Sequence, residues 1–294
     1  MFYSSQKKNI RRNRSVAEQR AEMDAYAKNA QISRLVHIDH TNIADVPCET
    51  FTLENAPIDK LLLYIHGGAY NAGSFTCYSP FVAHFAEKCN VKAILVGYRL
   101  APEAPFPAGL EDVVSVYRSL IESGIPGQNI LIGGDSAGGG LSIAAMLSFK
   151  EHGLPLPNAC VVLSPWVDLT NTSKTHQNRV KLDCMLIKRE LDEAAIMYAN
   201  GLDLRHPLIS PLFADLLGLP PLFIQVGTDE ILLDDSLKLA EKAKKAGVDV
   251  NIKVWKGMFH IWHMMEKFMP EAKQAMNELC SFIQNRLNLN SKLA

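Results

Sequence analysis

Short apolar runs alternate with longer helical segments along most of the chain. The apolar runs have the length and β-branched content of buried strands, and the segments between them have the apolar spacing of helices. The predicted strands are 61–65, 92–96, 129–133, 159–163, 222–226 and 250–255, and the main helical segments are 79–89, 109–123, 140–152 and 234–247. This alternation predicts an α/β protein with a mostly parallel central sheet flanked by helices. Ligand chemistry is then expected at the carboxyl ends of the strands.

One interval interrupts this alternation. Between the runs ending at Leu163 and beginning at Leu222 lie 58 residues, more than one crossover needs, and they include a helical apolar stripe at 186–200. Near the start, residues 14–30 are rich in helix formers, with Val16, Met23 and Tyr26 at the apolar positions of an amphipathic helix.

These two segments suggest a helical cap over the strand ends. We expect an N-terminal cap segment at 1–45 and a catalytic domain at 46–294 that carries a cap insertion at about 171–209.

Composition narrows the class of partner. The chain has 294 residues, of which 48% are hydrophobic, enough for a large buried core. Lys and Arg number 30 against 31 Asp and Glu, so no charge excess indicates nucleic acid or an anionic membrane. No apolar run reaches membrane-spanning length. A small-molecule substrate or another protein is therefore the expected partner, without nucleic acid and without stable membrane insertion.

The cysteines and the first residues bear on location. The six cysteines show no metal-ligand spacing and no CxxC pair, so we interpret them as reduced and the protein as cytoplasmic. Residues 1–20 are basic and lack the apolar core of a secretory signal. Their Arg and Ser content leaves a mitochondrial transit peptide open as an alternative to the start of a helix.

A glycine-rich stretch contains the candidate nucleophile. Residues 134–138, Gly-Asp-Ser-Ala-Gly, fit G-x-S-x-G, follow the predicted strand 129–133 and precede a predicted helix. This strand, sharp turn and helix arrangement exposes a nucleophilic serine at the end of a sheet, and the glycines allow close backbone approach. Ser136 is the predicted nucleophile.

A serine nucleophile requires a histidine base and a carboxylate that orients it, in the chain order serine, acid, histidine. Asp229 follows the strand 222–226 and His260 follows the strand 250–255, so we assign these two residues. Three neighbouring acids, Glu230, Asp234 and Asp235, are interpreted as charges in the first turn of the next helix. His263 lies one helical turn beyond His260 and is interpreted as a packing or surface residue, and structural roles are the default for the remaining histidines.

Hydrogen-bond donors for an oxyanion are expected after the strand 61–65. There His66-Gly67-Gly68-Ala69 matches the HGGG-type element of lipases and esterases. The predicted donors are the backbone N–H groups of Gly67, Gly68 and Ala137. His66 is interpreted as a residue that holds this loop.

Taken together, these elements resemble the hormone-sensitive lipase-like branch of the α/β-hydrolases, the group of the bacterial family IV esterases. The resemblance rests on "HGGAY", "YRLAPEAPFPAGLED", "GDSAGGG", "SPWVDLT", "SPLFADLLGLPPLFIQVGTDEILLDDS" and "GMFH", which span most of residues 60–265. It implies a serine carboxylesterase with a helical cap, with Ser136, Asp229 and His260 as the triad. Asp229 matches the first acid of the D-x-L-x-D-like element, written here "DEILLD".

The resemblance implies no metal and no organic cofactor, and it suggests a homodimer. Tyr98, Arg99 and Glu103 of "YRLAPE" are expected to be structural. Two departures from the family pattern concern the site: Ala69 stands where the family has a third glycine, and "HIW" replaces "HGF" after the catalytic histidine.

The cap is expected to set acyl preference. Met185, Leu186, Met197 and Tyr198 are candidates for an apolar acyl pocket, although Met and aromatic residues at helical spacing also make ordinary core. By analogy we expect short to medium acyl chains. An amidase, carbamate hydrolase or lactonase could use the same triad, and a non-catalytic small-molecule receptor is an alternative of a different class.

Overall fold

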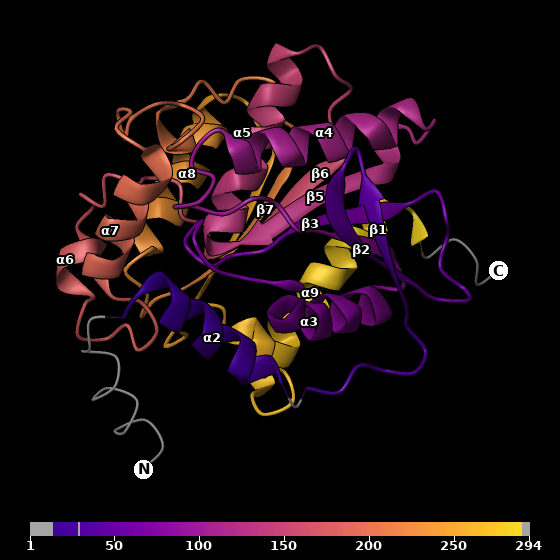
Figure 1. Ribbon diagram of the computed structural model, residues 1–294, viewed down its shortest axis with the longest axis horizontal. Coiled ribbons are helices and arrows are strands. Elements are labelled where there is room, and N and C mark those ends of the chain that lie inside the picture. The colour runs from indigo at the N-terminus through magenta and orange to yellow at the C-terminus, as the bar shows by residue number, and fades with distance from the viewer. Residues whose placement is uncertain (1–13, 29, 290–294) are drawn as a thin grey trace.

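The structure is a computed structural model that describes residues 14–28 and 30–289 (Figure 1). Its eight-stranded sheet has the order β1-β2-β4-β3-β5-β6-β7-β8. β1 and β4 each pair antiparallel with β2, and the remaining neighbours are parallel, which confirms the mostly parallel sheet. The strands are β1 (His37–Ile43), β2 (Val46–Thr52), β3 (Leu61–Ile65), β4 (Lys92–Val96), β5 (Ile130–Asp135), β6 (Ala159–Leu163), β7 (Leu222–Gly227) and β8 (Val250–Trp255).

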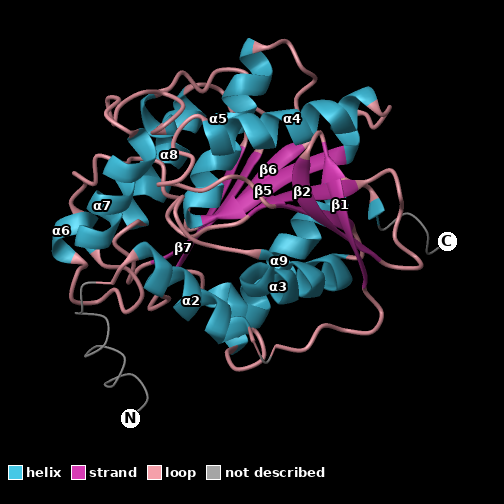
Figure 2. Cartoon of the chain, in the orientation of Figure 1, coloured by secondary structure: helices cyan, strands magenta, loops and turns pink. Residues whose placement is uncertain are grey.

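Helices cover both faces of the sheet (Figure 2). One face is covered by α3 (Phe75–Cys89) and α9 (Pro270–Arg286), which share an apolar cluster with the sheet. On the opposite face lie α4 (Ala108–Glu122), α5 (Ser136–Glu151) and α8 (Leu233–Lys245). The central strands β3, β5, β6 and β7 are therefore buried along their whole length, as parallel strands between two helical layers should be.

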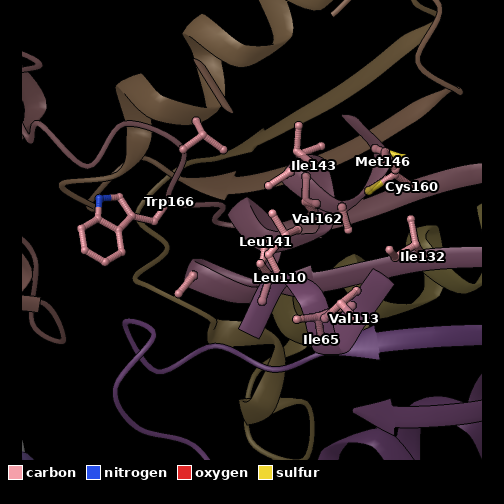
Figure 3. Close-up of a cluster of buried hydrophobic side chains, with 14 of the residues drawn as sticks. Ile65, Leu110, Val113, Ile132, Leu141, Ile143, Met146, Cys160, Val162 and Trp166 are labelled. Atoms are coloured by element: carbon pink, nitrogen blue, oxygen red, sulfur yellow. The ribbon is translucent and has the colours of Figure 1, made fainter. Parts of the chain in front are cut away.

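The core beneath the site joins α4 and α5 to the central strands (Figure 3). Branched side chains from neighbouring strands, including Ile65, Ile132 and Val162, meet Leu141 of α5 and Leu110 of α4 in this core. Because these side chains are fully or almost fully buried, the strand ends that carry the site rest on a rigid base.

The central sheet begins before the predicted boundary at residue 45. β1 begins at residue 37 and pairs with β2, so part of the predicted cap segment belongs to the sheet. The helix α2 (Val16–Ala27) is present, but it buries no side chain and Tyr26 is 75% exposed. The predicted transit-peptide alternative concerns residues that lie mostly outside the described range.

Polar contacts hold α2 in place together with Met23, which is partly buried against the apolar cluster of α3 and α9. Arg20 donates to the carbonyl oxygens of Asn71 (2.7 Å) and Ala101 (3.0 Å), and it forms an ion pair with Glu103. Arg14 donates to Glu190 from Nε at 3.1 Å. These contacts connect α2 both to the loop after β3 and to the insertion between β6 and β7.

That insertion contains α6 (Thr175–Asn178), α7 (Lys188–Ala199) and the 3-10 turn η2 (Pro211–Phe213). Two further 3-10 turns, η1 (Gly127–Asn129) and η3 (Trp262–Met265), precede β5 and α9. None of the helices in residues 14–28 and 30–289 is both long and apolar enough to cross a membrane.

Two cysteines do not behave as expected. Cys89 at the end of α3 and Cys280 in α9 form a disulfide, so the expectation of six reduced cysteines is wrong for this pair. The two residues are 191 positions apart, and nothing in their spacing revealed that α3 and α9 pack side by side. The inference of a cytoplasmic location rested on reduced cysteines and loses that premise.

Removing this disulfide is expected to lower the free energy of unfolding. A cross-link that closes so long a loop restricts the unfolded chain, and its loss costs about 2–5 kcal/mol. Urea unfolding of Cys89→Ala/Cys280→Ala against the oxidised wild type measures the effect. Dithiothreitol should shift the wild type to the midpoint of the double variant and leave the variant unchanged, whereas equal midpoints for all samples would contradict the prediction.

Candidate active site

Ser136 lies at the sharp turn between β5 and α5. Its φ of 52° is in the left-handed region, a strained conformation for a residue with a side chain. A Cβ at Gly134 or Gly138 would come within 2.2 or 2.1 Å of the carbonyl oxygen of Ile65 in the neighbouring strand. The two glycines are therefore needed for β5 and α5 to pass this strand, and the turn presents Ser136 at the carboxyl edge of the sheet.

His260 pairs with Glu230, and this corrects the predicted acid. His260 Nδ1 lies 2.8 Å from Glu230 Oε2, with Glu230 fully buried and His260 6% exposed. The sequence pattern predicts that Glu230 is a charge in the first turn of the next helix. Instead its Oε1 accepts hydrogen bonds from the Gly227 N–H (2.6 Å) and the Ser164 hydroxyl (2.7 Å). These donors fix the carboxylate so that its second oxygen faces the imidazole.

Asp229 lies in the same loop but its carboxylate is turned elsewhere. Its Oδ1 accepts a hydrogen bond from the Thr228 hydroxyl at 3.0 Å. Its backbone N–H donates to Met258 O at 3.1 Å, in the loop after β8 that carries His260. Consecutive residues in a tight loop point in different directions, so only one of the two acids can face His260. The structure selects Glu230.

The sequence contained a signal for Glu230. In a D-x-L-x-D-like element, leucine stands two positions after the acid and aspartate four positions after it. Counted from Glu230, these positions hold Leu232 and Asp234, whereas counted from Asp229 they hold Ile231 and Leu233. The spacing within the element therefore favoured Glu230.

The charge state of His260 reflects its neighbours. Burial by itself would lower the pKa of the imidazole, but the hydrogen bond and charge of Glu230 and the charges of Asp183 and Asp135 together raise it above its ordinary value. The surroundings stabilise the imidazolium that a general base becomes.

The other predicted bystanders have definite structural roles. Asp235 is fully buried and its Oδ2 accepts hydrogen bonds from the N–H groups of Val167 and Asp168, both at 3.0 Å. His263 is 1% exposed, and its Nε2 lies 2.9 Å from Gln225 Oε1. Burial lowers the pKa of His263 to about 3, so this ring is neutral and packs beneath the loop rather than at the surface.

One predicted oxyanion donor is already engaged. The Gly67 N–H donates to Asp135 Oδ1 at 3.1 Å, so the prediction that it faces an oxyanion is wrong. Within residues 14–28 and 30–289, the N–H groups of Gly68, Ala69 and Ala137 donate to no protein acceptor. Gly68 has a φ of 112° and Ala69 one of 52°, so the loop turns sharply just where these donors are exposed.

His66 holds this loop as expected. Its ring stacks on Tyr98 with 4.4 Å between the ring centroids, and its Nδ1 lies 2.7 Å from the Gly67 carbonyl oxygen. Burial lowers the pKa of His66 to about 4, so the ring is neutral and Nδ1 carries the proton that it donates. Tyr98 donates to His66 O at 2.9 Å and thus has the structural role that was expected.

Comparison with known proteins agrees with this geometry. A family model described as the alpha/beta hydrolase fold matches residues 62–264. An acetyl-hydrolase of Streptomyces hygroscopicus is 40% identical over 225 residues, covering 76% of this chain and 75% of the relative. An esterase of Acinetobacter venetianus is 37% identical, with coverage of 77% and 75%.

Solved structures narrow the assignment within that fold. An esterase from the bacterial hormone-sensitive lipase family superposes with a TM-score of 0.93 at 36% identity, covering 96% of this chain and 95% of that one. A hormone-sensitive lipase from a metagenome library gives 0.93 at 38% identity, with 97% of both chains covered. The chain belongs to the hormone-sensitive lipase branch of the alpha/beta hydrolases.

Sequence reasoning missed one polar residue of this hydrolase, Asp135. It is 1% exposed, and its carboxylate accepts from the hydroxyl groups of Tyr64 (2.9 Å) and Tyr78 (2.8 Å) as well as from Gly67. Burial raises the pKa of Asp135, and these donors counter part of that shift. Asp135 therefore joins the oxyanion loop to the nucleophile's turn. Its position inside G-x-S-x-G was the available signal.

The predicted acyl-pocket residues of the hydrolase are spread over the insertion between β6 and β7. Tyr198 is buried and stacks on Tyr70 of the loop after β3, with 3.9 Å between centroids, whereas Met185 is 48% exposed. Leu186 and Met197 are partly buried against the main core. Met197 also borders a cavity of about 410 Å³ between α2 and α7, lined by Arg14, Ser15, Val16, Gln19, Glu190, Glu193, Ile196 and Met197. Of the four candidates, Met197 is the one that lines this cavity.

No three His, Cys, Asp or Glu side chains in the described part of the hydrolase are grouped as metal ligands would be. The polar groups gathered at the strand ends are a hydroxyl, an imidazole with its carboxylate, and free backbone N–H donors. This set of groups is suited to acyl transfer.

Proposed function

We propose that this chain is a serine carboxylesterase that hydrolyses short- to medium-chain carboxylic esters through an acyl-enzyme on Ser136. Family membership supports the coarse assignment to the carboxylic ester hydrolases. The observation that carries the finer one is the buried Glu230–His260 pair, which lies on the same sheet edge as the strained turn of Ser136. A nucleophile, a base and an orienting acid in this order perform acyl transfer on this fold.

In the proposed mechanism, His260 removes the proton from the Ser136 hydroxyl as its oxygen attacks the ester carbonyl carbon. Glu230 holds the proton on Nδ1, which leaves Nε2 as the base, and its negative charge stabilises the imidazolium. The imidazolium then gives its proton to the departing alcohol. Water, deprotonated by His260 in the same way, releases the acid and restores Ser136.

The negative charge that develops on the carbonyl oxygen needs donors that are not otherwise engaged. We assign these to the N–H groups of Gly68, Ala69 and Ala137, with Ala69 taking the place of Gly67. The Ala137 N–H lies in the first turn of α5, where the partial positive charge of the helix also favours an oxyanion. Donors fixed in position before the reaction supply a large part of such catalysis.

Acyl preference is proposed to depend on the cap, because α2 and α7 lie beside the loops that carry the oxyanion donors. Met185, Leu186, Met197 and Tyr198 remain candidate contacts for the acyl chain. An amidase, carbamate hydrolase or lactonase would use the same groups. The receptor alternative has no support from this site, which retains a serine, a histidine and an orienting acid.

An ester series tests the proposal. Hydrolysis of p-nitrophenyl esters from acetate to dodecanoate should peak at a short chain, and a matched p-nitroanilide should be cleaved far more slowly. A fluorophosphonate probe should add once, on the peptide that contains Ser136. Faster cleavage of the anilide would favour the amidase alternative, and the absence of both turnover and labelling would contradict the proposal.

The homodimer and the cytoplasmic location stay predictions from the sequence.

A further inference from the structure

The backbone of Ile231, the residue that directly follows Glu230, is held by the cap insertion. Its N–H donates to Asp183 Oδ2 at 2.9 Å, and its carbonyl oxygen accepts from the Thr175 hydroxyl at 2.7 Å. Ile231 is fully buried, so neither backbone group has water as an alternative partner. The acid loop, which is the segment between β7 and α8 that carries Glu230, is therefore positioned by two side chains that belong to the cap and not to the strands.

Asp183 uses its other oxygen within the cap. Oδ1 accepts from the N–H groups of Met185 (2.9 Å) and Leu186 (2.8 Å), and the residue is 6% exposed. One buried carboxylate thus connects the turn that carries two candidate acyl contacts to the residue beside Glu230. If that turn moves, the same carboxylate transmits the movement to the acid loop.

We propose that Asp183 and Thr175 are positioning residues that hold the Glu230 carboxylate in its contact with His260. They thereby couple the turn that carries Met185 and Leu186 to the general base. This inference rests on the proposed function of Ser136, Glu230 and His260. Thr175 adds a second connection, because its N–H donates to Asp234 Oδ2 and its hydroxyl oxygen accepts from the Asp234 N–H, both at 3.2 Å. The cap therefore holds the acid loop at Ile231 and the first turn of α8 at Asp234.

The electrostatics of the site support the same coupling. The charged or titratable groups that face His260 are Glu230 after β7, Asp183 of the cap, Asp135 at the end of β5 and the neutral His263 of η3. Burial lowers the pKa of His260 and the three carboxylates raise it. Loss of the Asp183 charge, or a longer Glu230–His260 bond, would each lower this pKa. Because the base must be neutral, the acidic limb of kcat/KM would then move to lower pH.

The test compares Asp183→Asn with Asp203→Asn. The asparagine amide at 183 can still accept from Met185 and Leu186, but it turns a donor toward the Ile231 N–H. Asp203 is a matched control, since it is a cap carboxylate that accepts a backbone N–H from Arg205 within its own exposed turn. We expect kcat on p-nitrophenyl butyrate to fall about tenfold in Asp183→Asn through misplacement of the acid loop, and to stay within about twofold in the control.

The pH profile and the substrate profile separate positioning from a merely structural role. Asp183→Asn should move the acidic limb of kcat/KM to lower pH and weaken the discrimination between acetate and hexanoate esters, whereas Asp203→Asn should change neither. A lower melting temperature with an unchanged acidic limb and unchanged discrimination would overturn the proposal.

A second pair of variants covers the case in which Asp183→Asn does not fold. Thr175→Val keeps the side-chain shape but removes the bond to the Ile231 carbonyl, and Thr175→Ser keeps that hydroxyl. We expect Thr175→Val to lower kcat about fivefold with KM nearly unchanged, and Thr175→Ser to restore it, because only orientation of the acid loop is affected. Equal activity of Thr175→Val and the wild type would contradict the proposal that Thr175 positions the acid loop.

NMR titration of His260 keeps this inference separate from the proposed function. The imidazole can be titrated in the wild type and in Asp183→Asn whether or not the chain hydrolyses esters. If the wild type shows no turnover that depends on Ser136, the proposed function fails. The cap coupling is then decided by titrating Thr175→Val as well, because this variant changes no charge: a His260 pKa lower in Thr175→Val than in the wild type and Thr175→Ser supports it, and identical titrations in these three proteins overturn it.

Discussion

Ser136→Ala is expected to lower kcat on p-nitrophenyl butyrate by about 10⁶-fold, the scale seen when a serine hydrolase loses its nucleophile. Alanine removes the hydroxyl oxygen that forms the acyl bond, while His260 and the oxyanion donors remain in place. Water attack assisted by those donors would supply the small residual rate. The fold should be retained, because the change removes a single atom and the backbone at this turn is supported by the Trp166 N–H, which donates to Ser136 O at 2.9 Å.

The measurement is steady-state hydrolysis together with a burst titration that counts reactive sites. Ser148→Ala is the control, since Ser148 is buried in the same helix and lies 3.3 Å from His152 Nδ1, well away from the sheet edge. It should keep the burst and most of the rate. Retention of a tenth or more of the wild-type rate in Ser136→Ala would mean that another residue is the nucleophile.

Glu230→Gln should have the second largest effect, a fall in kcat of about 10⁴-fold, as expected when the orienting carboxylate of a triad becomes an amide. The amide oxygen can keep the bonds from the Gly227 N–H and the Ser164 hydroxyl, and the NH₂ group then faces His260 Nδ1. A donor at that position favours the tautomer with its proton on Nε2. That tautomer cannot accept the proton of Ser136.

Asp229→Asn is the matched control for the acid. Its amide oxygen can still accept from the Thr228 hydroxyl, so we expect a change in kcat of no more than about threefold. Both variants should be assayed across the pH range, so that a changed His260 pKa is not mistaken for a lost acid. The reverse result, with Asp229→Asn inactive and Glu230→Gln active, would restore the acid that the sequence first suggested.

The strands and the nucleophile's turn could be predicted because their signals are local. Each of the six predicted apolar runs forms a strand within one or two residues of its expected limits. Parallel strands buried on both faces must be continuously apolar, and the edge strand β8 instead alternates apolar residues with the exposed Asn251 and Lys253. The glycines at 134 and 138 marked the Ser136 turn for a similar reason: each leaves room for a specific backbone atom of the adjacent strand. The helix α2 was predicted, but its polar attachment through Arg20 was not, because its partners lie far along the chain.

The sequence by itself determined the fold class, the family, the serine on its turn and the histidine after the last strand. Each of these depends on residue types at short spacing, which the chain order preserves. Only the tertiary structure decided that Asp135 accepts a hydrogen bond from the Gly67 N–H and that Cys89 meets Cys280, and it showed the contact of Glu230 with His260 that the spacing of the acidic element had favoured. These choices depend on the direction in which a side chain leaves its loop and on which distant elements pack together. Both are set by the packing of the whole chain, which the residues of a short segment do not determine.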